Sequence, residues 1–250
     1  MLNEPNPGRF RSPEQPREEA LPKRFYTDAT VERADDGWRV LLDGRPVRTP
    51  GRAFLAMPGE ATAAMVADEW QAQGERIDPR TMPATRLANT ALDGVVSELQ
   101  AVREDVVRYA GTDLVCYRAD EPEGLVRREA EAWDPYLDWA SEAFGAHFVL
   151  AEGIVHTPQP REAIAAFGRE VERIDGPFRL AALHVMTALT GSALIALGVA
   201  HGAFAVDDAW RAAHVDEDWN IDLWGEDAEA AARRAAREIE MRTAARFATA

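Results

Sequence analysis

The hydrophobic periodicity of the chain changes near Pro58, and this change constrains the fold more than any other feature. Between residues 23 and 57, short runs of strand-forming residues are separated by turn signals. The strongest is Asp43-Gly44, because both central positions of a tight hairpin favour positive φ. Beyond Pro58, apolar residues recur every three or four positions, which is typical of helices. The sequence predicts an α+β fold, with a small N-terminal antiparallel β region followed by a larger C-terminal helical bundle.

The same patterns predict the individual elements and their grouping. Strands are expected over residues 30–33, 38–42, 46–49 and 54–57, with Pro46 and Pro50 at edges or turns. Helices are expected over residues 60–73, 92–106, 133–144, 164–174, 178–200, 207–213 and 226–247, with Asp207 as an N-cap. We expect a disordered tail over residues 1–22, a β-rich domain over 23–85 and a helical domain over 86–250.

The longest apolar stretch runs from Leu180 to Ala200 and carries polar residues such as His184 and Thr187. Its composition indicates a buried central helix rather than a membrane span. The first residues lack the apolar run of a secretory signal, and acidic residues interrupt the arginines that a mitochondrial presequence needs. We therefore expect a bacterial cytoplasmic protein, or a mitochondrial matrix protein if the source is eukaryotic.

The net charge of −15 excludes some classes of partner. Phosphate backbones and anionic membranes would be repelled, so we expect neither nucleic-acid binding nor membrane insertion. Cys116 is the only cysteine, so no internal disulfide can form. No activating base lies near it in the sequence, and we expect a buried structural thiol.

A search for catalytic and cofactor motifs gives little support for an enzyme. The five histidines show no HExxH spacing, and His184 is best explained as a hydrogen-bonded core residue. There is no GxGxxG after a strand and no GxxxxGK[ST] motif. Gly191-Ser192 lacks the GxSxG elbow, and we interpret it as a site of close helix packing. We therefore expect no cofactor, no metal and no small-molecule substrate.

Residues 215–227 contain six carboxylates and two tryptophans. One interpretation is a solvated acidic helix face whose tryptophans turn into the core. The other is a contact surface, since tryptophan is enriched in protein–protein interfaces and carboxylates attract basic partners. A metal-dependent hydrolase using this acidic cluster is the alternative from another functional class, although Trp219 and Ile221 interrupt the ligand spacing of a calcium loop.

Several blocks, taken in order, resemble the ATP12 family of assembly chaperones for the F1 sector of ATP synthase. The blocks are Lys23-Arg24-Phe25-Tyr26, residues 42–50 (LDGRPVRTP), 69–73 (EWQAQ), Ile77-Asp78-Pro79, Met82-Pro83, 112–118 (TDLVCYR), Trp133-Asp134-Pro135, Gly191-Ser192 and the acidic residues 216–227. The resemblance spans roughly residues 23–227. Asn220 departs from the glutamine that the family pattern leads us to expect.

The resemblance implies a chaperone that binds the unassembled α subunit of F1, shields its subunit interface and promotes F1 assembly, without chemistry of its own. It implies that Glu217, as the acidic position of the C-terminal motif, is the first partner-binding residue. Its companions are Trp219, Asp216, Trp224 and Glu226. Arg118 could pair with an acidic helix. A general holdase for many clients is a further possibility.

Overall fold

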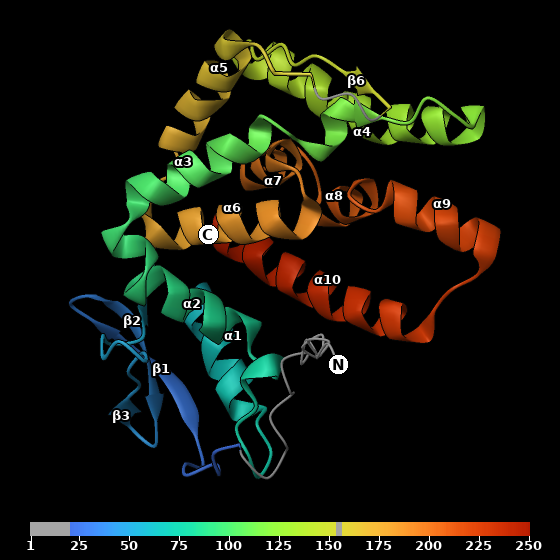
Figure 1. Cartoon of the computed structure of the whole chain (residues 1–250). Coiled ribbons are helices and arrows are strands. Elements are labelled where there is room, and N and C mark those ends of the chain that lie inside the picture. The colour runs from blue at the N-terminus through green and yellow to red at the C-terminus, as the bar shows by residue number, and fades with distance from the viewer. Residues whose placement is uncertain (1–20, 154–156) are drawn as a thin grey trace, which may run out of the picture.

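The computed structural model describes residues 21–153 and 157–250 (Figure 1). Of the expected tail, residues 1–20 lie outside the described residues. Leu21 and Pro22 are described, and both are tied to the chain that follows α1. The guanidinium of Arg76 donates to the carbonyl of Leu21 at 2.7 Å, and the N–H of Ile77 donates to the carbonyl of Pro22 at 2.8 Å.

The N-terminal sheet is built around its second strand. Its strands are β1 (Ala29–Ala34), β2 (Gly37–Leu42), β3 (Arg45–Pro46) and β4 (Ala56–Met57). β2 pairs antiparallel with the other three strands, so β3 and Pro46 lie at an edge as predicted. The predicted hairpin turn is confirmed, because Asp43 and Gly44 adopt φ values of 46° and 76°.

Ten α-helices follow within the described residues, and they confirm the α+β class. They are α1 (Glu60–Gln71), α2 (Pro83–Asp93), α3 (Leu99–Ala110), α4 (Glu123–Phe144), α5 (Arg161–Glu172), α6 (Gly176–Thr190), α7 (Ala193–Ala200), α8 (Val206–Ala212), α9 (Val215–Trp224) and α10 (Ala228–Ala248). The 3₁₀ turns are η2 (Pro79–Thr81), η3 (Val95–Ser97) and η4 (Leu114–Cys116), and β5 (Tyr117–Arg118) pairs parallel with β6 (Ala151–Glu152).

Helix α6 lies at the centre of the helical part, between α2, α3, α7 and α10 (Figure 1). α1 covers one face of the sheet, while α4 and α5 lie at the far end of the molecule from it. The side chains buried in the sheet and in the helices form one continuous hydrophobic cluster. Residue 85 lies within α2, and the division into domains at 85/86 stays a prediction.

The predicted helix over 178–200 is wrong as a single element, because the chain breaks at Gly191-Ser192. Gly191 has a φ of 68° and ends α6 in the left-handed conformation that favours glycine. The hydroxyl of Ser192 accepts a hydrogen bond from the N–H of Ile195 at 3.0 Å and caps α7. The pair therefore separates two buried helices instead of allowing close packing within one.

The predicted helix over 92–106 is also two elements, because α2 ends at Asp93 and α3 begins at Leu99. The carboxylate of Asp93 accepts from the hydroxyl of Thr49 at 2.5 Å and from the N–H of Gly51 at 2.8 Å. These bonds anchor the end of α2 on the loop between β3 and β4. The chain then turns at Gly94, a poor helix former.

The structure contradicts the prediction for Asp207 and confirms the one for Cys116. Asp207 is not an N-cap, because α8 begins at Val206 and places Asp207 in its first turn. Cys116 is buried as expected, and burial beside Asp113 raises the pKa of its thiol to about 12. None of the described helices is long and apolar enough to cross a bilayer.

Candidate functional site

The acidic block forms a helix of its own, α9, which lies along the edge of the helical part between α4 and α10 (Figure 1). Asp216, Glu217 and Asp218 occupy its first turn, where negative charge favours the exposed backbone N–H groups. No residue of α9 is buried. The side chain of Trp224 is 83% exposed and that of Leu223 is 56% exposed. Part of the block is therefore an apolar surface open to solvent.

Helix periodicity divides four of the five predicted site residues between two sides of α9, and Glu226 follows the end of this helix. Glu217 and Trp224 are seven positions apart, so they share a face. Together with Glu226 they line a groove of about 530 Å³ between α9 and the start of α10. Asp216 and Trp219, three positions apart, lie on the side that faces α4. The structure therefore brings three of the predicted residues together and places the other two elsewhere.

The side of α9 that faces α4 is held by an aromatic contact. Trp219 is half-buried, and its ring lies against Gly124 in the first turn of α4. A β-carbon at Gly124 would lie 2.8 Å from Cη2 of Trp219, closer than such atoms approach, so this packing needs glycine. The guanidinium of Arg128 lies 5.0 Å from the centroid of the Trp219 ring and pairs with Asp222 at 2.7 Å.

The side that faces α10 is held by charged contacts. Asp218 pairs with Arg234 of α10, and Glu217 lies 3.9 Å from Nε2 of His214. Burial lowers the pKa of His214, which favours the neutral ring. The amide of Asn220 donates to the carbonyl of Asp216 at 2.9 Å, so this residue is bound to its own helix. The carboxylates of these pairs are exposed, whereas Arg234 is part-buried and His214 is buried, so the contacts are only partly open to solvent.

Two carboxyl groups meet where α9 crosses α4. Glu129 is 2% exposed, accepts from the N–H of Ala119 at 2.8 Å and is hydrogen-bonded to Asp216. Burial, together with the Asp216 carboxylate, raises the pKa of Glu129 to about 7. A proton held by this pair therefore joins α9 to α4, and its loss places two negative charges side by side.

This pair predicts a pH dependence of stability that Glu129→Gln should remove. The folded protein keeps the Glu129 proton to about pH 7, whereas the unfolded chain loses it near 4.5, so its stabilising contribution disappears as pH rises between these values. Between pH 5 and pH 8, the free energy of unfolding in urea should fall by about 2 kcal/mol more for wild type than for the variant. A constant difference between the two proteins would contradict the assignment.

Arg118, whose role was open, joins two elements in the interior. Its Nε donates to the carbonyl of Val115 at 2.9 Å, and its Nη2 lies 2.8 Å from a carboxylate oxygen of Asp134 in α4. The side chain is 7% exposed and its guanidinium lies over the ring of Trp133. The ion pair with Asp134 joins β5 to α4.

The acidic side chains do not converge on a point. Asp216, Glu217 and Asp218 follow one another in a helix, so their side chains leave the axis about 100° apart. Within residues 21–153 and 157–250, no three His, Cys, Asp or Glu side chains are grouped closely enough to hold a metal ion.

The residues of α4 that hold α9 were missed from the sequence. The predicted helix began at Trp133, whereas α4 begins at Glu123, so Gly124, Arg128 and Glu129 were outside any expected element. A local signal was present, because Glu123 follows Pro122 and apolar residues recur at Leu125, Val126 and Ala132.

Comparison with known proteins gives one consistent result. Residues 23–141 match the family described as ATP12 chaperone protein. The crystal structure of the Atu1473 protein from Agrobacterium tumefaciens is 52% identical, with a TM-score of 0.87, covering 91% of this chain and 85% of that one. Atp12 from Paracoccus denitrificans is 41% identical, with a TM-score of 0.83, covering 92% of this chain and 99% of that one. The chain therefore belongs to the ATP12 chaperone family.

Proposed function

We propose that this protein binds the unassembled α subunit of F1 ATP synthase, shields its subunit interface and promotes assembly of F1. The proposal rests on membership of the ATP12 chaperone family and on the exposed end of α9. An unassembled subunit exposes an apolar surface meant for its neighbour, and such surfaces aggregate. A chaperone must cover that surface and later release it, so a modest, partly polar interface is suited to the task.

The observation that carries the proposal is the combination of exposed Trp224 with carboxylates around it. A tryptophan that is 83% exposed leaves a large apolar surface in water, which a partner can bury with a gain in free energy. Glu217 and Glu226 line the same groove and would attract a basic surface. Asp216 and Trp219 would act indirectly in this proposal, by holding α9 against α4.

The direct test is the solubility of the α subunit. Freshly synthesised F1 α subunit should remain in the supernatant in the presence of this protein and should sediment in its absence. An unrelated aggregating protein should sediment in both cases, because we propose a dedicated partner rather than a general holdase. Equal sedimentation of α with and without this protein would overturn the proposal, and protection of both clients would indicate a holdase.

The proposal includes no chemical step, no cofactor and no small-molecule substrate. The alternative of a metal-dependent hydrolase has less support, since Asp218 and Asp222 are each paired with an arginine. Calorimetric titration with Mg²⁺, Ca²⁺ and Zn²⁺ separates the two functions, because a hydrolase site would bind one of these ions specifically.

A further inference from the structure

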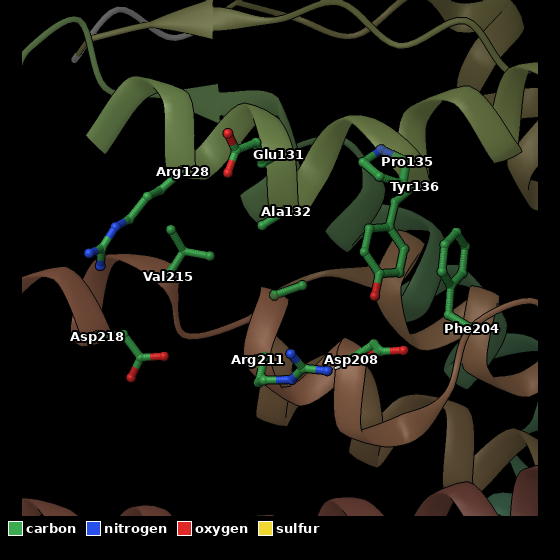
Figure 2. A pocket seen from close by; sticks show the side chains of 11 residues that line it. Arg128, Glu131, Ala132, Pro135, Tyr136, Phe204, Asp208, Arg211, Val215 and Asp218 are labelled. Carbon is green, nitrogen blue, oxygen red and sulfur yellow. Dashed lines mark hydrogen bonds and ion pairs between the residues drawn. The ribbon is translucent and has the colours of Figure 1, made fainter. Parts of the chain in front are cut away.

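A second groove borders α9 where this helix meets α4 and α8. It lies between α4, α8 and α9, has a volume of about 540 Å³, and is drawn in Figure 2. Its inner surface is mostly apolar and is formed by Ala132, Pro135, Tyr136, Phe204, Ala212 and Val215. Grooves of this size and lining bury apolar groups of a ligand or partner.

One polar group at the inner surface of this groove has no hydrogen-bond partner among the residues that the structure describes. Tyr136 is 2% exposed, and its ring stacks on Phe204 with the centroids 4.1 Å apart. Its hydroxyl is directed from α4 towards α8 across the groove (Figure 2), and it makes no hydrogen bond to another described residue. Burial, with the Asp208 carboxylate nearby, raises the pKa of Tyr136, so the hydroxyl keeps its proton and can donate. The hydroxyl oxygen is not fully buried and opens onto the groove, where water or an acceptor oxygen of a bound segment can reach it.

The rim of the groove carries more negative than positive charge. Its carboxylates come from Glu131, Asp208 and Asp218, whereas its positive charges are those of Arg128 and Arg211. Each of these groups has an oppositely charged partner: Arg211 pairs with Asp208, Arg128 with Asp222 and Asp218 with Arg234, while Glu131 lies 4.0 Å from Arg127. The rim has three negative and two positive side chains, a net formal charge of −1, so its edge favours a basic residue over an acidic one.

We infer that this groove seats a short apolar segment of the client polypeptide, flanked by a basic residue, with a carbonyl oxygen of the segment accepting the Tyr136 hydroxyl. The inference rests on the proposed function and names where a segment of the α subunit lies. Val215 and Asp218 belong to α9, so this groove and the groove that carries Trp224 lie on two sides of the same helix. A client bound there would contact α4, α8 and α9 together.

Two variants test the groove, one by removing a single hydroxyl and the other by filling the space. Tyr136→Phe removes only the hydroxyl and keeps the stacked ring, so it should weaken binding of purified F1 α subunit by about 3- to 10-fold. Ala132→Trp fills the groove from α4 and should weaken binding by at least about 30-fold. The matched control is Ala165→Trp, an exposed alanine that lines a separate groove of about 610 Å³ between α3 and α5. This control should bind α as wild type does.

Binding is measured by surface plasmon resonance with immobilised α subunit, after thermal melts show that all variants are folded. Weakened binding by both groove variants, with normal binding by Ala165→Trp, supports the inference. Normal binding by Ala132→Trp and Tyr136→Phe overturns the inference and leaves the proposed function intact. Absence of binding by wild type overturns both the inference and the proposed function.

Native mass spectrometry tests a different occupant of the groove. A small molecule that is retained by wild type and lost from Ala132→Trp would overturn the inference, because the groove would then hold a metabolite.

Discussion

Asp113→Ala should destabilise the protein by about 4 kcal/mol at pH 5, because it removes the acceptor of several buried donors. Asp113 is fully buried between η4 and the start of α7. Its carboxylate accepts from the N–H of Val115 at 3.2 Å and from that of Leu194 at 3.0 Å. The hydroxyl of Ser192 and the N–H of Ala193 also bond to it. None of these donors can reach water when the carboxylate is absent.

Asp113→Ala should lower the free energy of unfolding by less at pH 8 than at pH 5, because the pKa of Asp113 is raised in the folded protein. Burial raises this pKa to about 6 from its ordinary 3.8, although the surrounding donors oppose the shift. The folded state therefore keeps a proton that the unfolded chain releases earlier, and wild type loses this contribution as pH rises towards 6 and above. The alanine variant has no such contribution to lose.

Urea unfolding of wild type, Asp113→Ala and Asp113→Asn at pH 5 and pH 8 measures both effects. The asparagine variant keeps one acceptor oxygen and a similar volume, so it should retain part of the lost stability. If Asp113→Ala unfolds within about 1 kcal/mol of wild type at pH 5, the buried network is not a major source of stability.

The parts of the fold that follow local rules could be predicted from the sequence. The Asp43-Gly44 turn was predicted because the conformation it needs is a property of those two residues. The helices α1 and α5 follow from the apolar positions in each segment, and α10 follows from its composition, which is rich in alanine and arginine. The break between α6 and α7 was missed because Gly191 and Ser192 lie inside a long apolar run. A glycine followed by serine is nevertheless a cap signal for both helix ends.

The candidate site could be predicted less completely, because its organisation depends on contacts between distant segments. Composition identified the acidic block, and helix periodicity alone would place Glu217 and Trp224 on one face. That Trp219 packs on Gly124 and that Asp216 meets Glu129 depends on how α9 crosses α4. Nothing in either segment specifies that crossing.

The double variant Glu217→Lys, Trp224→Ala should have the largest effect on α-subunit binding, a loss of about 100-fold or more. The lysine reverses charge beside the groove between α9 and α10, and the alanine removes the largest exposed apolar side chain of α9. The fold should be unchanged, because Trp224 is exposed and Glu217 lies 3.9 Å from its nearest basic partner, His214. Thermal melts within a few degrees of wild type would show this.

Each substitution has a matched control elsewhere on the surface. Glu162→Lys reverses an exposed charge on α5, and Phe25→Ala removes an aromatic side chain that is 74% exposed near the sheet. The double control should bind immobilised α subunit as wild type does, since neither residue lies near α9. If the control Glu162→Lys, Phe25→Ala lost as much affinity for the α subunit as Glu217→Lys, Trp224→Ala does, overall charge and exposed aromatic area would govern binding. Normal binding by Glu217→Lys, Trp224→Ala would remove α9 as the contact, because this variant lacks both the charge and the apolar surface on which the contact depends.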